Sequence, residues 1–164
     1  MLAIGITLAA IIVIADQYTK TLALEHLFNQ PPIELLPFFN LVLVFNSGAA
    51  FGFLNNAGGW QNIFFIVVAG AVGIGIVVAL WRIGARNPQM SVSLSLILGG
   101  AVGNVIDRFR YGYVVDFIDL FYQHWHWPAF NVADATITIG AILLIMDSIG
   151  WTIIFRKQND QQSN

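Results

Sequence analysis

The sequence predicts an all-α membrane protein with four transmembrane helices. Of its 164 residues, 57% are apolar and only 10% are charged, whereas a soluble domain carries about 25% charged residues. A chain this short cannot bury so much apolar surface in one core. In addition, four segments approach the roughly 20 apolar residues that a helix needs to cross a bilayer. We therefore expect lipid around much of residues 1–164, which we treat as one membrane domain.

The first predicted helix spans residues 2–24 and carries Asp16 and Lys20 in its second half. It lacks the basic amino-terminal region and the small-residue cleavage pattern of a secretory signal peptide. We therefore expect this helix to be retained. The spacing of Asp16 and Lys20, four residues apart, favours a salt bridge on one helix face.

Three further helices are predicted at residues 60–81, 90–108 and 132–155. The first of these is uncharged, and Gly99, Gly100 and Gly103 in the next favour close packing against another helix. The last contains Asp134 and Asp147. We expect Asp147 to pair with a polar group on the cytoplasmic side.

Two long connections separate the helices, at residues 28–59 and 111–131. Residues 39–45 are rich in β-branched and aromatic side chains and predict a strand, and residues 113–118 predict a second extended piece. Backbone groups near a bilayer must be paired, so small strands packed on the helix ends are expected. Residues 124–127 alternate His and Trp, which is typical of an aromatic belt rather than a metal site.

The cations predict the orientation of the chain. Four of them flank the short connection and the carboxyl terminus, namely Arg82, Arg86, Arg156 and Lys157. The positive-inside rule places these regions, and with them both termini, in the cytoplasm, although Arg108 and Arg110 lie on the other side. The two long connections then face outward.

In this orientation, polar residues from four regions reach one level near the outer surface. Ionisable groups at membrane depth are costly and mark a functional site. The residues that converge are Asp16, Lys20, Asn104, Asp107, Arg108, Asp116, Asn131 and Asp134.

The four carboxylates at this level differ in their neighbours. Asp16 has Lys20 as a partner, and Asp107 has Arg108 or Arg110, but Asp116 and Asp134 have no cation within four residues. Two unpaired carboxylates close together cannot both ionise easily, so one stays protonated. The ionised one can take a proton from water while the other polarises a carbonyl, which is general acid–base hydrolysis.

Five motifs now resemble a known family. They are DQYTK at 16–20, NSGAAF at 46–51, GGAVGNVIDR at 99–108, VVDF at 114–117 and FNVAD at 130–134. Together, in this order on four apolar spans, they resemble the bacterial lipoprotein signal peptidases (signal peptidase II) over nearly the whole chain.

The resemblance implies a fold, an activity and a set of site residues. The fold would be four transmembrane helices with a small extracytoplasmic β-cradle and a short amphipathic outer helix. Residues 55–59 and the neighbouring loop are the candidate segment for this outer helix. The activity would be an aspartic endopeptidase that cleaves diacylglyceryl-modified prolipoproteins before the lipidated cysteine. Asp116 and Asp134 would be catalytic. The supporting residues would be Asn46, Gly48, Asn104, Asp107, Arg108 and Asn131, with Asp16 and Lys20 as a brace.

The resemblance also implies a location in the bacterial cytoplasmic (inner) membrane, with membrane lipids and prolipoproteins as partners. We expect a monomer with no cofactor and no metal. We also expect no nucleic-acid partner, since the net charge is −2 and the seven cations are scattered. The main alternative is a small proton-coupled transporter or channel subunit, which would string carboxylates through the membrane. A non-enzymatic assembly subunit is the third hypothesis.

Overall fold

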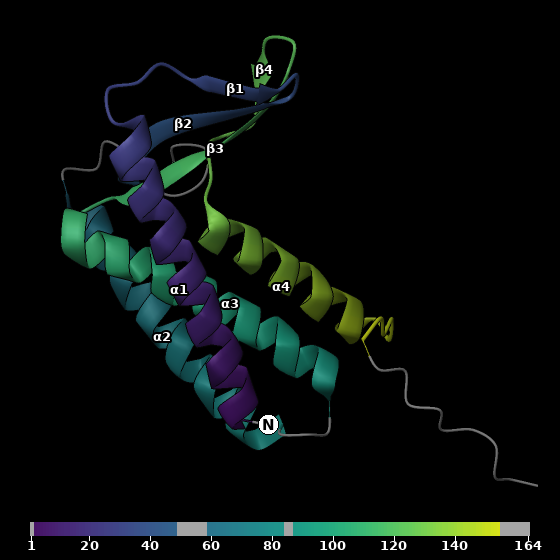
Figure 1. The fold of residues 1–164 in the computed structure, drawn as a ribbon. Helices are drawn as coiled ribbons and strands as arrows, with labels where there is room; N and C mark the ends of the chain where they lie inside the picture. The colour runs from purple at the N-terminus through teal and green to yellow at the C-terminus, as the bar shows by residue number, and fades with distance from the viewer. Residues whose placement is uncertain (1, 49–58, 84–86, 155–164) are drawn as a thin grey trace, which may run out of the picture.

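The structure is a computed structural model that describes residues 2–48, 59–83 and 87–154. In this part of the chain, helices lie side by side and a small sheet sits at one end of them (Figure 1). The elements follow in the order α1 (Leu2–Leu27), β1 (Ile33–Leu36), β2 (Phe39–Asn46), α2 (Trp60–Ile83), α3 (Pro88–Tyr111), β3 (Val114–Tyr122), β4 (Trp125–His126) and α4 (Val132–Ser148).

The first three helices confirm three of the predicted apolar spans. Within the described residues, α1, α2 and α3 are long and apolar enough to cross a membrane. Each extends up to three residues beyond the predicted bounds. Local signals set the ends of α3, because Asn87 accepts a hydrogen bond from the Met90 N–H at 3.0 Å and Gly112 adopts a left-handed φ of 80°.

The fourth helix is shorter than predicted, since α4 ends at Ser148 rather than at residue 155. Its 17 residues span about 26 Å at 1.5 Å per residue, against about 30 Å of hydrocarbon. The chain turns at Gly150, where φ is 78°. Beyond the turn, the buried Gln89 of α3 accepts hydrogen bonds from the Ile153 and Ile154 N–H groups at 2.7 and 3.1 Å. A side chain of another helix therefore replaces the final helical turn.

The strands form one antiparallel sheet in the order β1-β2-β3-β4. The predicted strand at 39–45 is confirmed as β2, and the extended piece at 113–118 forms the first half of β3. The β2–β3 register shifts between Leu41 and Val44, beside Asp116. Bulges of this kind are common next to active sites, where they redirect a side chain. The outer helix expected near residues 55–59 lies outside the described part, apart from Gly59.

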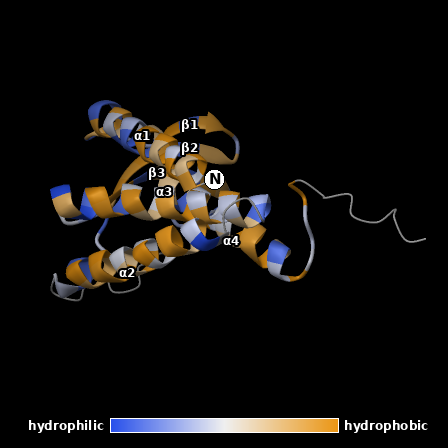
Figure 2. Cartoon of the chain, turned by 90° about the horizontal axis from the view of Figure 1, so that it is seen from below, coloured by the Kyte–Doolittle hydropathy of each residue, from blue (hydrophilic) through white to orange (hydrophobic). Residues whose placement is uncertain are grey.

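Helix α3 lies at the centre of the helical layer and contacts α1, α2 and α4 (Figure 1). The predicted close packing of its glycines is confirmed. A Cβ on Gly99 would lie 2.8 Å from the Ile12 Cβ, and a Cβ on Gly103 would lie 2.5 Å from the Asp16 carboxylate. The surface of the helices that faces outward is apolar. Figure 2 shows hydrophobic residues along most of α2. Only 11% of the apolar window in α2 is buried, as expected for a lipid-facing helix.

Candidate active site

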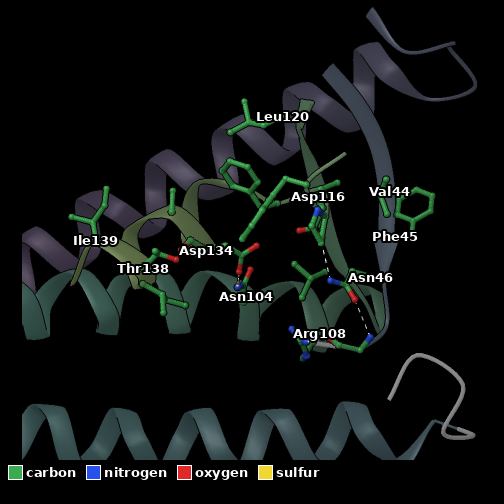
Figure 3. Close-up of a pocket in the computed structure, with 18 residues that line it drawn as sticks. Val44, Phe45, Asn46, Asn104, Arg108, Asp116, Leu120, Asp134, Thr138 and Ile139 are labelled. Atoms are coloured by element: carbon green, nitrogen blue, oxygen red, sulfur yellow. Dashed lines mark hydrogen bonds between the residues drawn. The ribbon is translucent and has the colours of Figure 1, made fainter. Parts of the chain in front are cut away.

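A cavity of about 870 Å³ lies between the sheet and the adjoining parts of α3 and α4 (Figure 3). Its wall is mostly apolar, with contributions from Phe45, Leu120, Trp127 and Phe130. One part of the wall is polar, where all the residues except Gly48 have polar or charged side chains. This polar part consists of Asn46, Gly48, Asn104, Arg108, Asp116 and Asp134.

Asp116 enters the cavity from β3 and is 1% exposed. Its two carboxyl oxygens accept hydrogen bonds from Asn131 Nδ2 at 2.7 Å and from Asn46 Nδ2 at 3.0 Å. Burial, and after it the neighbouring charge of Asp134, raise the pKa of Asp116 to about 7 against the lowering effects of the two amide donors and of Lys20. Asp116 is therefore a carboxyl group that exchanges its proton near neutral pH.

Asp134 lies in the first turn of α4 and forms a capping box with Asn131. Its Oδ2 accepts from the Asn131 N–H at 3.3 Å, and its Oδ1 accepts from Asn104 Nδ2 at 2.8 Å. The amino-terminal end of a helix favours a negative charge through its free N–H groups and its dipole. These contacts favour the ionised form of Asp134.

Asn131 and Asn104 connect the two carboxyl groups. Asn131 is fully buried, and its Nδ2 lies 2.7 Å from Asp116 Oδ1 and 3.2 Å from Asn104 Oδ1. Asn104 in turn donates to Asp134. Two amides thus lie between the carboxyl groups and fix the orientation of each.

A buried ionic network lies behind the cavity. Lys20 Nζ lies 2.9 Å from Asp16 Oδ2, 2.8 Å from Asp107 Oδ2 and 2.9 Å from Asn104 Oδ1. The predicted Asp16–Lys20 salt bridge is confirmed. The expectation that Asp107 pairs with Arg108 or Arg110 is wrong, because α1 packs against α3 and brings Lys20 to Asp107.

The two aspartates of this network also hold the backbone next to the cavity. Asp16 Oδ1 accepts from the Ala133 N–H at 2.9 Å, and Asp107 Oδ2 accepts from the Val115 N–H at 3.1 Å. Ala133 directly precedes Asp134, and Val115 directly precedes Asp116. Because Lys20 joins Asp16 to Asp107, a single salt-bridge network anchors the chain beside both cavity carboxyl groups.

Arg108 belongs to the wall of the cavity and is 9% exposed. Its Nη2 donates to the Gly48 carbonyl at 2.7 Å. The Gly48 N–H donates in turn to Asn46 Oδ1 at 3.0 Å. Arg108 therefore fixes the turn that presents Asn46 to Asp116.

The predicted residues fall into two groups. Six of them line the cavity, as named above, and the others form the support behind it, namely Asp16, Lys20, Asp107 and Asn131. Gln17 was missed, although it donates to Asp107 Oδ1 at 2.8 Å. An uncharged polar residue inside an apolar helix was the available signal.

Polar groups away from the cavity are also paired. Asp147 accepts a hydrogen bond from Asn87 Nδ2 at 2.7 Å, which confirms the expected polar partner. His126 Nδ1 lies 2.9 Å from both carboxyl oxygens of Asp119, a pair that the aromatic-belt interpretation missed. Among the described residues, no three or more His, Cys, Asp or Glu side chains are placed to hold a metal ion.

The fold and the site together define a class of protein. Apolar helices suited to a bilayer carry, at one end, a cavity with two carboxyl groups in different environments. Two carboxyl groups that share a cavity can serve as an acid and a base, which acid–base hydrolysis requires.

The chain belongs to the signal peptidase II family, because the family model described as signal peptidase (SPase) II matches residues 8–150. It is 47% identical over 161 residues to a lipoprotein signal peptidase of Acinetobacter baumannii, covering 98% of this chain and 89% of the relative. It is 49% identical over 149 residues to a lipoprotein signal peptidase of Burkholderia thailandensis, covering 89% and 86%.

Solved structures support the same family. Two solved structures of a bacterial membrane enzyme, at 2.3 and 1.9 Å resolution, superpose on this chain with TM-scores of 0.78 and 0.75. Their sequence identities are 33% and 35%. The first match covers 97% of this chain and 95% of the other, and the second covers 92% and 95%. The chain is thus a member of a protease family with the fold of a membrane enzyme.

Proposed function

We propose that this chain is an aspartic endopeptidase that removes the signal peptide from diacylglyceryl-modified prolipoproteins, with Asp116 and Asp134 as its catalytic pair. The relatives named lipoprotein signal peptidase support the substrate class. The observation that carries the catalytic assignment is the cavity itself, because it holds these two carboxyl groups in contrasting environments.

The contrasting environments assign a role to each carboxyl group. We assign the role of base to Asp134, because the donors at the helix end favour a negative charge on it, so that in its ionised form it takes a proton from the attacking water. Asp116, with a pKa of about 7, carries a proton and donates it to the oxygen of the scissile carbonyl as water adds to the carbon. The product of this step is a neutral tetrahedral diol, so no full negative charge develops on the substrate oxygen.

Collapse of the diol restores both groups. The bond between carbon and nitrogen breaks, and Asp134 gives its new proton to the leaving amine. Asp116 recovers a proton from one hydroxyl as the carboxylic acid of the signal peptide forms. One water is consumed and both carboxyl groups return to their starting states, so the pair is ready for another cycle without a covalent intermediate.

The surrounding residues hold the pair and the substrate. Asn46 and Asn131 orient Asp116, and Asn104 orients Asp134. Arg108 and Gly48 border the same space and are placed to bind the substrate backbone. The remaining wall is apolar, which suits the apolar end of a signal peptide and the lipid chains of the modified cysteine.

We further propose four membrane crossings with both termini in the cytoplasm of a bacterial cell and the cavity near the outer face of the inner membrane. Helix α4 is short, and residues 149–154 complete its crossing with exposed Ile149, Trp151 and Ile153. Water reaches this level but not the bilayer centre. Burial of each CH₂ of the substrate contributes about 0.8 kcal/mol, so the lipidated substrate stays in the membrane where the cavity lies. We also propose that the chain acts as a monomer.

The positions of the carboxylates favour an enzyme over a proton-coupled transporter. Asp16, Asp107, Asp116 and Asp134 are gathered in one set of contacts rather than strung along the helices. Asp147 is separate and pairs with Asn87.

The test is cleavage of a purified diacylglyceryl prolipoprotein in detergent micelles. We expect Asp116→Asn and Asp134→Asn each to lower the rate by about 10²–10⁴-fold, the usual contribution of a positioned acid or base. Asp119→Asn is the matched control, because Asp119 is also a buried carboxyl group of β3 but does not line the cavity. Near wild-type turnover in either of the first two variants would refute the assignment.

A further inference from the structure

The outer end of α2, the end nearest the sheet, differs from the rest of that helix. Most of α2 faces lipid, and Trp60, Ile63 and Phe64 are 54%, 66% and 43% exposed. Asn62 and Phe65 instead face α3, since both contact Arg108 of that helix. A residue pair three positions apart lies on one helix face, so this end of α2 presents a two-residue face to its neighbour.

Both residues of that face contact Arg108. The Arg108 guanidinium carbon lies 4.8 Å from the centre of the Phe65 ring, and Asn62 Nδ2 donates to the Arg108 carbonyl at 3.1 Å. A desolvated cation over an aromatic face gains up to about 2 kcal/mol from the negative charge on the face of the ring. The α2 residues therefore hold both the side chain and the backbone of Arg108.

The guanidinium of Arg108 is also connected to the cavity. Arg108 donates to the Gly48 carbonyl, the Gly48 N–H donates to Asn46 Oδ1, and Asn46 Nδ2 donates to Asp116 Oδ2 (Figure 3). The distances in this series are 2.7, 3.0 and 3.0 Å. A continuous series of contacts thus runs from the Phe65 ring to a cavity carboxyl group.

We propose that Phe65 is a positioning residue of the peptidase, whose ring holds the Arg108 guanidinium against the Gly48 carbonyl and thereby keeps Asn46 hydrogen-bonded to Asp116. This inference rests on the proposed function for its effect on turnover, but not for its effect on Asp116. An aliphatic side chain of similar bulk fills the same space without attracting the cation. Arg108 then leaves its position for part of the time, and so does Asn46.

The loss has a defined direction. The hydrogen bond from Asn46 lowers the pKa of Asp116, so weakening it raises that pKa. Asp134 also raises the pKa of Asp116 and Lys20 lowers it. Neither of these residues belongs to the series of contacts that joins Phe65 to Asp116, so their effects on this pKa should stay constant when the ring is removed.

The experiment compares Phe65→Leu, Phe65→Tyr and Phe64→Leu with the wild type. Phe64 is the matched control, because it is the adjacent phenylalanine and is 43% exposed. Its ring packs edge-on against Phe65 with 5.4 Å between the centroids, so Phe64→Leu measures the loss of packing on Phe65 while the ring next to Arg108 remains. Two quantities are measured for each protein. They are kcat on a diacylglyceryl prolipoprotein at several pH values, and the titration of ¹³C-labelled Asp116 followed by NMR without substrate.

We expect Phe65→Leu to lower kcat at pH 7 by about 2- to 30-fold, which is the loss of a cation–π contact of this kind. Its Asp116 titration should move to higher pH. Phe65→Tyr should restore both properties because it keeps the ring, and Phe64→Leu should leave both unchanged.

Three outcomes would overturn the inference. One is an unshifted Asp116 titration in Phe65→Leu, which would leave only a structural role for the ring. Another is an effect of Phe64→Leu as large as that of Phe65→Leu, and a third is a Tyr variant no better than Leu. Lack of cleavage by the wild type would count against the proposed function alone, since the titration would still test the link to Asp116.

Discussion

Asp116 should make the stability of the protein depend on pH, and Asp116→Asn should remove that dependence. The carboxyl group is 1% exposed, and its pKa in the folded protein is about 7, against 3.8 when it is free of the fold. The folded state therefore binds a proton between these two values that the unfolded state has already released. Over that range, stability falls as the pH rises.

The size of the fall follows from the shift. A difference of about three pKa units corresponds to about 4 kcal/mol at 1.36 kcal/mol per unit. The stabilising contribution is complete below pH 3.8 and is lost as the pH rises through 7. Between pH 5 and pH 7, the wild type should lose about 2–3 kcal/mol that Asp116→Asn does not lose.

The substitution also has an effect that is the same at every pH. Asn46 and Asn131 both donate to the carboxyl group of Asp116, and an amide in its place offers one oxygen instead of two. The lost hydrogen bond costs about 1–3 kcal/mol. The comparison across pH cancels this cost, so the slope rather than the absolute stability carries the test.

The assay is reversible unfolding in detergent at pH 5, 6, 7 and 8, with wild type, Asp116→Asn and Val115→Ala. Val115 is fully buried beside Asp116, so its truncation should destabilise the protein equally at each pH. We expect the stability difference between wild type and Asp116→Asn to change by about 2–3 kcal/mol between pH 5 and pH 7. A constant difference would show that burial does not raise the pKa of Asp116.

Two further predictions concern the support behind the cavity. Lys20→Met leaves the buried carboxylates of Asp16 and Asp107 without their cation. It should lower the free energy of unfolding by about 3–5 kcal/mol, and turnover should fall in parallel. An unchanged thermal midpoint in detergent would contradict this prediction. Gly103→Ala places a Cβ 2.5 Å from the Asp16 carboxylate and should cost about 1–3 kcal/mol. Gly75→Ala meets nothing within 4 Å and should be neutral or stabilising in the same measurement.

Local patterns predicted most of the fold because they act over a few residues. Apolar length located α1, α2 and α3, and β-branched residues located β2. The end of α4 could not be predicted in this way. Gln89 binds the backbone of Ile153 and Ile154 from another helix, and no pattern within residues 132–155 signals that contact.

The site shows the same division. The spacing of Asp16 and Lys20 predicted their salt bridge because one helix face brings them together. The predicted partner of Asp107 was wrong, because its actual partner, Lys20, is 87 positions away in the chain. In the sequence, Phe65 is one more apolar residue of a lipid-facing helix. Its contact with Arg108 could not be predicted, because it depends on how α2 packs on α3.

The sequence by itself therefore determined that the protein is built for a bilayer, and which polar residues gather at one end of its helices. Their cost in lipid is a property of each residue and needs no neighbour to be known. Only the tertiary structure decided which charges pair and which amides orient Asp116 and Asp134. Hydrogen bonds and ion pairs require contact within about 3–4 Å, and the packing of distant segments alone brings those atoms together.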